Sequence, residues 1–121
     1  MKVLVVDDAP EIGILMEDIL SPFGYEVDCA PNASAAFEKM RKSPPDLVLL
    51  DVMMPVKDGF QFLEELKATA LRHIPVVMVT VKRDKADIER GLKAGAADYV
   101  TKPFDPDDLV NRIKKILEKK G

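Results

Sequence analysis

The 121-residue chain has a single cysteine, no long apolar run and no excess of positive charge, and each shortage excludes a class of function. One cysteine, Cys29, excludes an internal disulfide and any multi-cysteine zinc site. The longest mostly apolar run, residues 74–81, is interrupted by Thr80 and is far shorter than the ~20 residues that span a bilayer. The G-x-G-x-x-G and P-loop motifs of nucleotide-binding folds are also missing.

The charge balance is slightly acidic, with 18 Lys and Arg against 21 Asp and Glu, for a net charge of −3. This argues against a protein that coats nucleic acid or anionic lipid. The N-terminus leads from one lysine through a short apolar stretch directly into acids, which is unlike a signal peptide. The length suits one domain. We therefore expect one cytoplasmic domain over residues 1–121, with neither membrane nor nucleic acid as a direct partner.

Short apolar runs alternate with stretches of helical periodicity along the whole chain. The runs are rich in Val and Leu and cover residues 3–6, 25–29, 47–50, 76–79 and 99–101. The first, third and fourth are continuous, which is typical of strands covered by helices on both faces. The helices are expected to begin at or beside Pro10, Asn32, Gly59, Asp84 and Asp105. This order predicts an α/β fold with a doubly wound, five-stranded parallel sheet.

The same patterns predict which side chains are buried. Residues spaced three and four apart mark the inner face of the first helix: Ile12, Leu15, Met16, Ile19 and Leu20. The fourth helix has only two bulky apolar residues, Ile88 and Leu92, so we expect it to pack weakly. Cys29 is expected to be a buried, inert thiol. In the last helix, Asp105 and Asp108 have capping-box-like spacing.

Polar residues follow the predicted strands at the ends where ligands bind in open α/β sheets. Asp7 and Asp8 follow the first strand, and Asp51 follows the third; Thr80 and Lys102 follow the last two. Three neighbouring carboxylates repel one another, and one lysine cannot neutralise them, which indicates that a ligand binds there. Oxygen ligands without additional His or Cys suit Mg²⁺ or Mn²⁺. A carboxylate there can also attack phosphorus and form an aspartyl-phosphate.

Four segments together resemble the receiver domain of response regulators in two-component signalling. They are Val5-Val6-Asp7-Asp8, residues 46–59, Val79-Thr80 and residues 96–104, and the resemblance covers essentially the whole chain. It implies a flavodoxin-like (βα)5 fold with strand order 2-1-3-4-5.

The resemblance also implies a metal-binding and phosphoacceptor site. Asp51 would be the phosphoacceptor and a metal ligand. Asp8 would bind Mg²⁺ directly, Asp7 mainly through water, and the Met53 backbone carbonyl would be the third protein ligand.

A second group of residues is implied to respond to phosphorylation. Lys102 would pair first with Asp51 and then with the phosphoryl group, and its bond to Pro103 is expected to be cis. Thr80 would hydrogen-bond a phosphoryl oxygen, and Tyr99 would turn inward with it.

Partners follow from the same resemblance. A sensor histidine kinase or phosphotransfer protein would donate the phosphoryl group, and an effector would bind the surface of the fourth helix, fifth strand and fifth helix. A dimer that forms on phosphorylation is compatible with this scheme. The chain would catalyse only its own phosphorylation and dephosphorylation, so it is not expected to be an enzyme.

One departure from the family pattern leaves an alternative open. Val81 occupies a position that is usually small in this family, and its bulk could hinder access to Asp51 or the movement of Thr80. A constitutive interaction domain that is never phosphorylated is therefore the competing interpretation. A phosphatase is disfavoured because Met53, not an acid, lies two residues after Asp51. Flavin binding is disfavoured because Asp7 and Asp8 would repel its phosphate.

Overall fold

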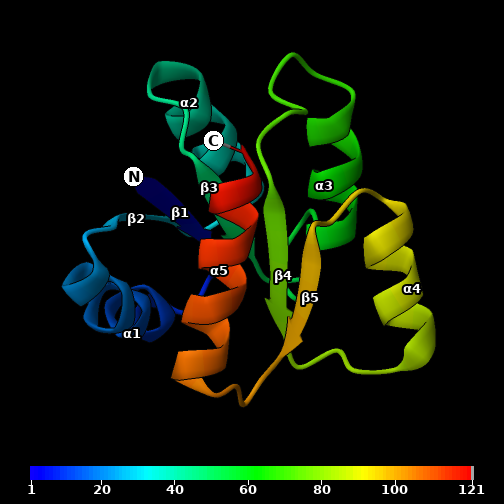
Figure 1. The fold of residues 1–121 in the computed structure, drawn as a ribbon. Coiled ribbons are helices and arrows are strands. Elements are labelled where there is room, and N and C mark those ends of the chain that lie inside the picture. Colours follow the sequence, from blue (N-terminus) through cyan, green and yellow to red (C-terminus); the bar gives the residue numbers. More distant parts are fainter. Residues whose placement is uncertain (121) are drawn as a thin grey trace.

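The computed structural model describes residues 1–120 as a parallel sheet between two layers of helices (Figure 1). The strands lie in the order β2-β1-β3-β4-β5, and every neighbouring pair is parallel, which confirms the predicted doubly wound, flavodoxin-like fold. The strands are β1 (Lys2–Val6), β2 (Glu26–Ala30), β3 (Leu47–Leu50), β4 (Val76–Thr80) and β5 (Asp98–Thr101). The helices are α1 (Pro10–Leu20), α2 (Ala33–Lys42), α3 (Gly59–Lys67), α4 (Lys85–Lys93) and α5 (Pro106–Lys120), with a short 3₁₀ turn η1 (Ser21–Phe23).

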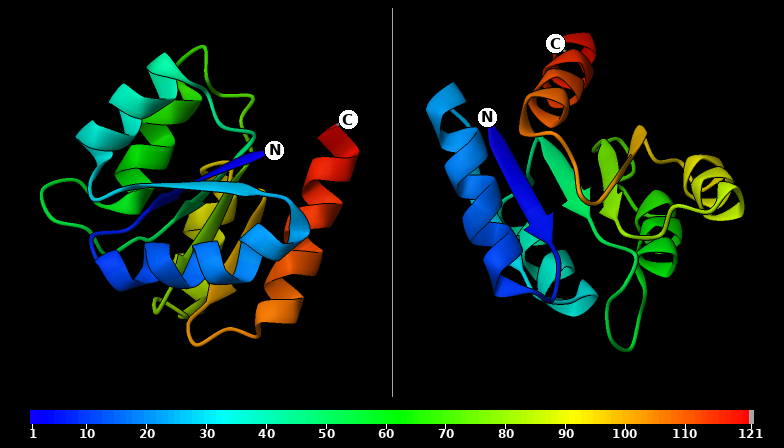
Figure 2. Two further views of the ribbon diagram at one scale, coloured as in Figure 1. Left: turned by 90° about the vertical axis from the view of Figure 1, so that its left-hand side faces the viewer. Right: turned by 90° about the horizontal axis from the view of Figure 1, so that it is seen from below.

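Each face of the sheet has its own apolar core. Helices α1 and α5 cover one face, and α2, α3 and α4 cover the other (Figure 2). Side chains alternate between the two cores along each central strand: in β1, Val3 and Val5 face the α1 and α5 side, while Leu4 and Val6 face the other. Burial on both sides explains why the central strands are continuous runs of Val and Leu.

At the starts of α2 and α3, side chains accept hydrogen bonds from free backbone N–H groups, whereas α1 and α4 have no such side-chain cap. The Asn32 carboxamide oxygen accepts from the Ala35 N–H at 2.8 Å, as its predicted capping role requires. Asp58 and Gln61 form a capping box at the start of α3, a feature that was not among the predicted helix caps. Within residues 1–120, every helix is too short or too polar to cross a membrane.

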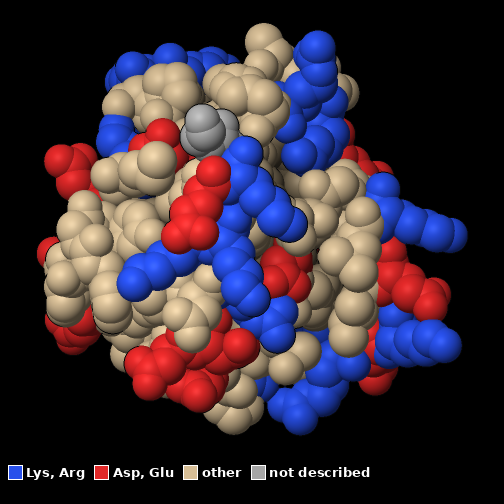
Figure 3. Space-filling view, in the orientation of Figure 1, with Lys and Arg blue, Asp and Glu red and all other residues tan. Residues whose placement is uncertain are grey.

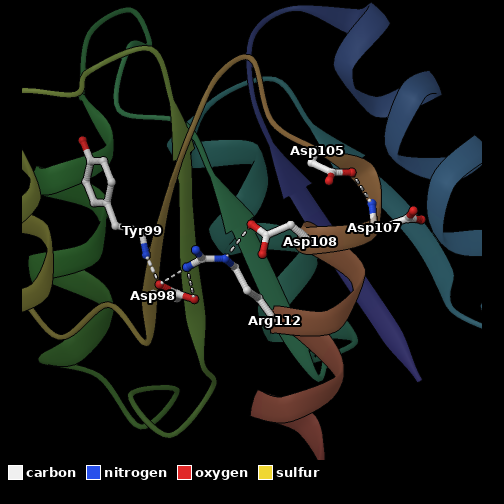
Figure 4. A network of polar contacts seen from close by, with 6 residues as sticks. All are labelled: Asp98, Tyr99, Asp105, Asp107, Asp108 and Arg112. Atoms are coloured by element: carbon white, nitrogen blue, oxygen red, sulfur yellow. Dashed lines mark hydrogen bonds and ion pairs between the residues drawn. The ribbon is translucent and has the colours of Figure 1, made fainter.

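Basic side chains gather along α5, and acidic ones lie at its first turn (Figure 3). The predicted capping box there is wrong. Asp105 accepts from the Asp107 N–H at 3.0 Å, but the Asp108 carboxylate instead accepts from Arg112 at 2.9 Å. The Arg112 guanidinium also bonds both carboxylate oxygens of Asp98, at 2.8 and 2.9 Å, and so joins α5 to the start of β5 (Figure 4). The Asp108 side chain is therefore bonded to Arg112 further along α5 and does not reach back to the start of the helix.

Two burial predictions, those for Leu15 and Cys29, are wrong. Leu15 lies on the predicted inner face of α1 but is 42% exposed. Cys29 is exposed because β2 is an edge strand, although its Sγ lies against the backbone of α1 at Gly13. Weak packing of α4 is confirmed, since Gly91 is the one buried residue among the described residues of that helix.

Gly59 fixes how closely α3 approaches the loop after β3. A Cβ at this position would lie 2.3 Å from the Asp51 carbonyl oxygen and 2.8 Å from the Val52 Cα, both backbone atoms. The Gly59 N–H donates to the Val52 carbonyl at 2.8 Å, so helix and loop cannot separate without losing that bond.

We expect Gly59→Ala to lower the free energy of unfolding by about 2–3 kcal/mol, because the clash is with backbone atoms that cannot rotate away. Gly24→Ala is the matched control: its φ of 86° disfavours alanine, but nothing lies within 4 Å of the added methyl. We expect that variant to lose about 1 kcal/mol, from backbone strain alone. Urea unfolding followed by circular dichroism measures both losses, and equal losses would contradict the close-approach argument.

Candidate functional site

Three carboxylates meet at the carboxyl ends of the two central strands β1 and β3. One oxygen each from Asp7, Asp8 and Asp51 lies within 4.8 Å of the others. Neighbouring strands produce this arrangement, because Val6 and Leu50 are partners in the sheet and the Asp51 N–H donates to the Val6 carbonyl at 3.0 Å. The structure therefore brings together the acids that the sequence analysis placed at one edge of the sheet.

Lys102 is the cation of this cluster. Its Nζ donates to Asp7 Oδ2 at 2.9 Å and lies 3.5 Å from Asp51 Oδ2, so its shorter contact is with Asp7 rather than with the expected Asp51. The Lys102 N–H donates to the Thr80 carbonyl at 2.8 Å, and the Arg83 guanidinium donates to the Lys102 carbonyl at 2.9 Å. The N–H and the carbonyl of Lys102 are therefore both hydrogen-bonded, which fixes the backbone from which its side chain extends. The Lys102–Pro103 peptide is cis, as the resemblance implied.

Local backbone groups hold two of the three carboxylates and leave the third open. Asp7 Oδ1 accepts from the Ala9 N–H at 3.0 Å, and Asp51 Oδ1 accepts from the Met53 N–H at 3.2 Å. Asp8 is exposed and, within residues 1–120, forms no hydrogen bond or ion pair. The Met53 carbonyl accepts no backbone hydrogen bond from this part of the chain. Asp8 and the Met53 carbonyl are therefore open to an added ligand.

The cluster carries more negative charge than its single ammonium neutralises. At separations within 4.8 Å, each carboxylate pair repels by about 1–4 kcal/mol for effective dielectric constants between those of water and about 20. Asp7 and Asp51 are only 9% and 8% exposed, so water screens them little. Three carboxylates and a free carbonyl offer only oxygen, the ligand that hard divalent cations prefer. The residues present therefore fit Mg²⁺.

Thr80 and Tyr99 are linked through one peptide segment. Thr80 is fully buried at the end of β4, and its Oγ1 accepts from the Lys82 N–H at 3.3 Å. The Tyr99 hydroxyl donates to the Lys82 carbonyl at 2.6 Å. Burial raises the pKa of Tyr99 to about 12, with smaller contributions from Asp87 and Asp51, so the hydroxyl stays a donor at neutral pH. Movement of Thr80 would therefore act on the segment that the Tyr99 hydroxyl binds.

The ring of Tyr99 connects β5 to α4. It is 8% exposed and already lies inward, pointing away from Arg112 (Figure 4). A Cβ at Gly91 in α4 would lie 3.0 Å from the ring, so the missing side chain leaves room for this contact. Sequence patterns gave no sign of the Arg83 contact with Lys102 or of the Lys82 link, because backbone carbonyls are the acceptors in both.

Two side chains flank the acidic edge in the loops after β3 and β4. Met53 is 50% exposed and Val81 is 52% exposed. Both are apolar, and neither can orient a water molecule as an amide or carboxylate would. The bulk of Val81 is thus turned substantially to solvent rather than packed within the core.

Comparisons with known proteins identify one protein family. The family model of the response regulator receiver domain matches residues 3–114. The transcriptional regulatory protein RprY of Bacteroides fragilis and the phosphate regulon transcriptional regulatory protein PhoB of Escherichia coli are each 40% identical over 119 residues. These matches cover 98% of this chain but 50% and 52% of the two relatives, so the chain spans about half their length.

Solved structures show the same architecture. The BeF3-activated N-terminal receiver domain of RstA from Klebsiella pneumoniae has a TM-score of 0.90 and 32% identity, covering 97% of this chain and 98% of that one. The chemotaxis protein CheY4 of Vibrio cholerae has a TM-score of 0.87 and 31% identity, covering 94% of this chain and 96% of that one.

We expect Asp8→Asn to raise the melting temperature without divalent cation by about 2–4 °C, because it removes an unpaired charge from a repelling cluster. The same substitution should abolish the stabilisation that millimolar Mg²⁺ gives the wild type, since binding to the native state raises stability by mass action. Differential scanning calorimetry with and without Mg²⁺ measures both effects. Asp18→Asn, which neutralises an exposed acid near the other end of α1, should keep the stabilisation by Mg²⁺. It should raise the cation-free melting temperature only slightly, because it removes a negative charge from the C-terminal turn of a helix. A lower melting temperature for cation-free Asp8→Asn would show that repulsion does not dominate.

Proposed function

The chain belongs to the response regulator receiver domain family, and from this premise we propose that it is a signalling switch controlled by phosphorylation of Asp51. The observation that carries the proposal is the buried Asp51 carboxylate with Lys102 at 3.5 Å and two further carboxylates beside it. That arrangement offers a nucleophile, a cation for the incoming group and a set of metal ligands at one point of the surface.

Phosphoryl transfer would begin at an Asp51 oxygen. This oxygen attacks the phosphorus of a phosphohistidine on the donor protein, a P–O bond forms, and the P–N bond breaks as the imidazole leaves. Lys102, which lies between Asp7 and Asp51, would turn to the transferred group and pair with its oxygens. The Met53 N–H bond to Asp51 Oδ1 orients the carboxylate and leaves Oδ2 toward the lysine.

Asp8, Asp51 and the Met53 carbonyl would hold Mg²⁺, with Asp7 acting mainly through water; Mn²⁺ suits the same ligands. The bound ion supplies positive charge to the phosphoryl oxygens during transfer. Asp8 is suited to direct ligation because it has no other partner within residues 1–120.

Thr80 and Tyr99 would convert phosphorylation into a change of surface. A phosphoryl group on Asp51 would offer the Thr80 hydroxyl an acceptor for its own hydrogen. Movement of Thr80 toward that group would draw Oγ1 away from the Lys82 N–H, from which it accepts at 3.3 Å. Displacement of Lys82 alters the acceptor of the Tyr99 hydroxyl, and the ring contacts α4 at Gly91. Because α4 is weakly packed, it is the element that can shift at low cost. The face formed by α4, β5 and α5 would then bind an effector or a second copy of the chain.

The surrounding system would be a two-component pathway in the cytoplasm. A sensor histidine kinase or a phosphotransfer protein is the proposed donor, and the chain would catalyse only changes in its own phosphorylation.

Val81 favours one competing function, a constitutive interaction domain that is never phosphorylated. Its side chain is bulky at a position where the family usually has a small residue.

Phosphorylation of Asp51 can be tested directly by intact mass. After incubation with acetyl phosphate and Mg²⁺, we expect the wild type to gain one phosphoryl unit and Asp51→Asn to gain none. Asp105→Asn, at an exposed acid that begins α5, is the matched control and should be labelled like the wild type. Equal labelling of Asp51→Asn would refute the assignment, and absence of labelling in the wild type would favour the constitutive domain.

The lifetime of the phosphorylated state gives a further prediction. Hydrolysis requires a water in line with the P–O bond, and Met53 and Lys82 cannot accept a hydrogen bond from it well. We therefore expect slow self-dephosphorylation. Met53→Asn should hydrolyse about tenfold faster, the effect of one hydrogen bond of ~1.4 kcal/mol.

Release of phosphate over time in saturating Mg²⁺ measures the rate of hydrolysis. Val81→Ala, compared with the wild type, should be labelled more rapidly by small phosphodonors, because the smaller side chain eases their access to Asp51. Hydrolysis in the wild type as fast as in Met53→Asn would show that orientation of water by this side chain is unimportant.

A further inference from the structure

A cavity of about 640 Å³ lies outside the acidic cluster, between α2 and the loop and helix that follow β3. Its apolar walls are Ala33 and Phe37 from α2, and Pro55 and Val56 from the loop. The volume falls within the range of about 300–1,000 Å³ that is typical of small-molecule sites. None of the three clustered aspartates lines it, so it is a separate site.

Arg41 is the charged group of this cavity that has no ion-pair partner within residues 1–120. Its Cζ lies 5.7 Å from the Phe37 ring centroid, and within residues 1–120 the guanidinium forms no ion pair. The other charged groups of the lining, Lys57 and Glu65, pair with each other. The Asn32 carboxamide oxygen is occupied by its bond from the start of α2. The lining therefore carries one uncompensated positive charge, on a planar group suited to a carboxylate.

Val56 holds an apolar side chain at the mouth of the cavity in a strained turn. Its φ is 69°, in the left-handed region that β-branched residues rarely adopt, and the Lys57 N–H closes the turn on the Pro55 carbonyl at 2.8 Å. The side chain is fully exposed. Strain of this kind is costly and concentrates at ligand contacts. Within residues 1–120, no side chain covers Val56 to offset that cost.

We propose that this cavity binds a small aromatic carboxylate. The ring of the ligand would contact Phe37 and Val56 and remove their apolar surface from water, while its carboxylate would accept hydrogen bonds from Arg41. A single negative charge matches the single unpaired guanidinium. A dianionic phosphate fits less well, because Arg41 would neutralise only one of its two negative charges and the other would lie in the same cavity as the Glu65 carboxylate. The acidic cluster takes no part in this binding, so the proposal stands whether or not Asp51 accepts a phosphoryl group.

The test titrates the full chain with 2-naphthoate and with its neutral analogue 2-naphthamide, and follows backbone amide shifts by NMR. We expect 2-naphthoate to bind with a dissociation constant of about 1 mM or below, as its size allows. The largest shifts should fall in residues 32–41 and 55–57. The amide should bind at least fivefold more weakly, because it lacks the charge that Arg41 attracts. Shifts located elsewhere, or equal affinity for the two ligands, would overturn the proposal.

Three variants separate the charge effect from damage to the fold. Arg41→Gln should bind the two ligands equally, whereas Lys42→Gln, which removes the adjacent positive charge on α2, should keep the wild-type preference. Val56→Asp and Val56→Asn have the same shape, and both tolerate the left-handed conformation better than valine. The Asp variant should bind 2-naphthoate at least fivefold more weakly than the Asn variant. A preference for 2-naphthoate that survives Arg41→Gln would also overturn the proposal.

Discussion

Repulsion among the carboxylates of Asp7, Asp8 and Asp51, which the Lys102 ammonium only partly neutralises, is the constraint on which the rest of the structure depends. Asp7 and Asp51 follow adjacent strands, yet Lys102 follows β5 and must reach past the ends of β4 and β3 to bond Asp7. Neither core gains from this arrangement, and the apolar burial on both faces of the sheet has to outweigh it. The cluster therefore keeps more negative charge than its one ammonium neutralises.

A short chain of contacts leads from that cluster to the molecular surface. Thr80 and Tyr99 bind opposite ends of the Lys82 residue, and the Tyr99 ring rests against Gly91. Ile88 of α4 is partly buried against the core. The Arg90 guanidinium adds contacts to α3, since it lies 4.5 Å from the Phe60 ring centroid and 3.5 Å from Glu64. These exposed contacts are weak compared with the buried stripe of α5, which explains why α4 rather than α5 is the mobile element in the proposed switch.

Sequence patterns predicted what depends on local periodicity and missed what depends on the reach of a side chain. The Val and Leu runs and the Asn32 cap located the strands and the start of α2, and hence the edge where the acids meet. They could not show that Lys102 lies nearer to Asp7 than to Asp51, because sheet twist and neighbouring backbone contacts set that distance. Leu15 and Cys29 were misassigned because exposure depends on where a neighbouring element ends. A valine at Val56 gives no local sign of a left-handed turn.

The long separation in sequence between the parts of the cluster has a consequence for how the protein is made. Asp7 and Lys102 are 95 residues apart, and the acids are synthesised well before the lysine. A growing chain on the ribosome therefore exposes its carboxylates to water, without the cation or the final strand that would gather them. Because Lys102 directly follows β5, the cation is in place only once that strand has joined the sheet. A chain truncated before β5 would therefore lack both the last strand of the sheet and the ammonium that pairs with Asp7 and lies near Asp51.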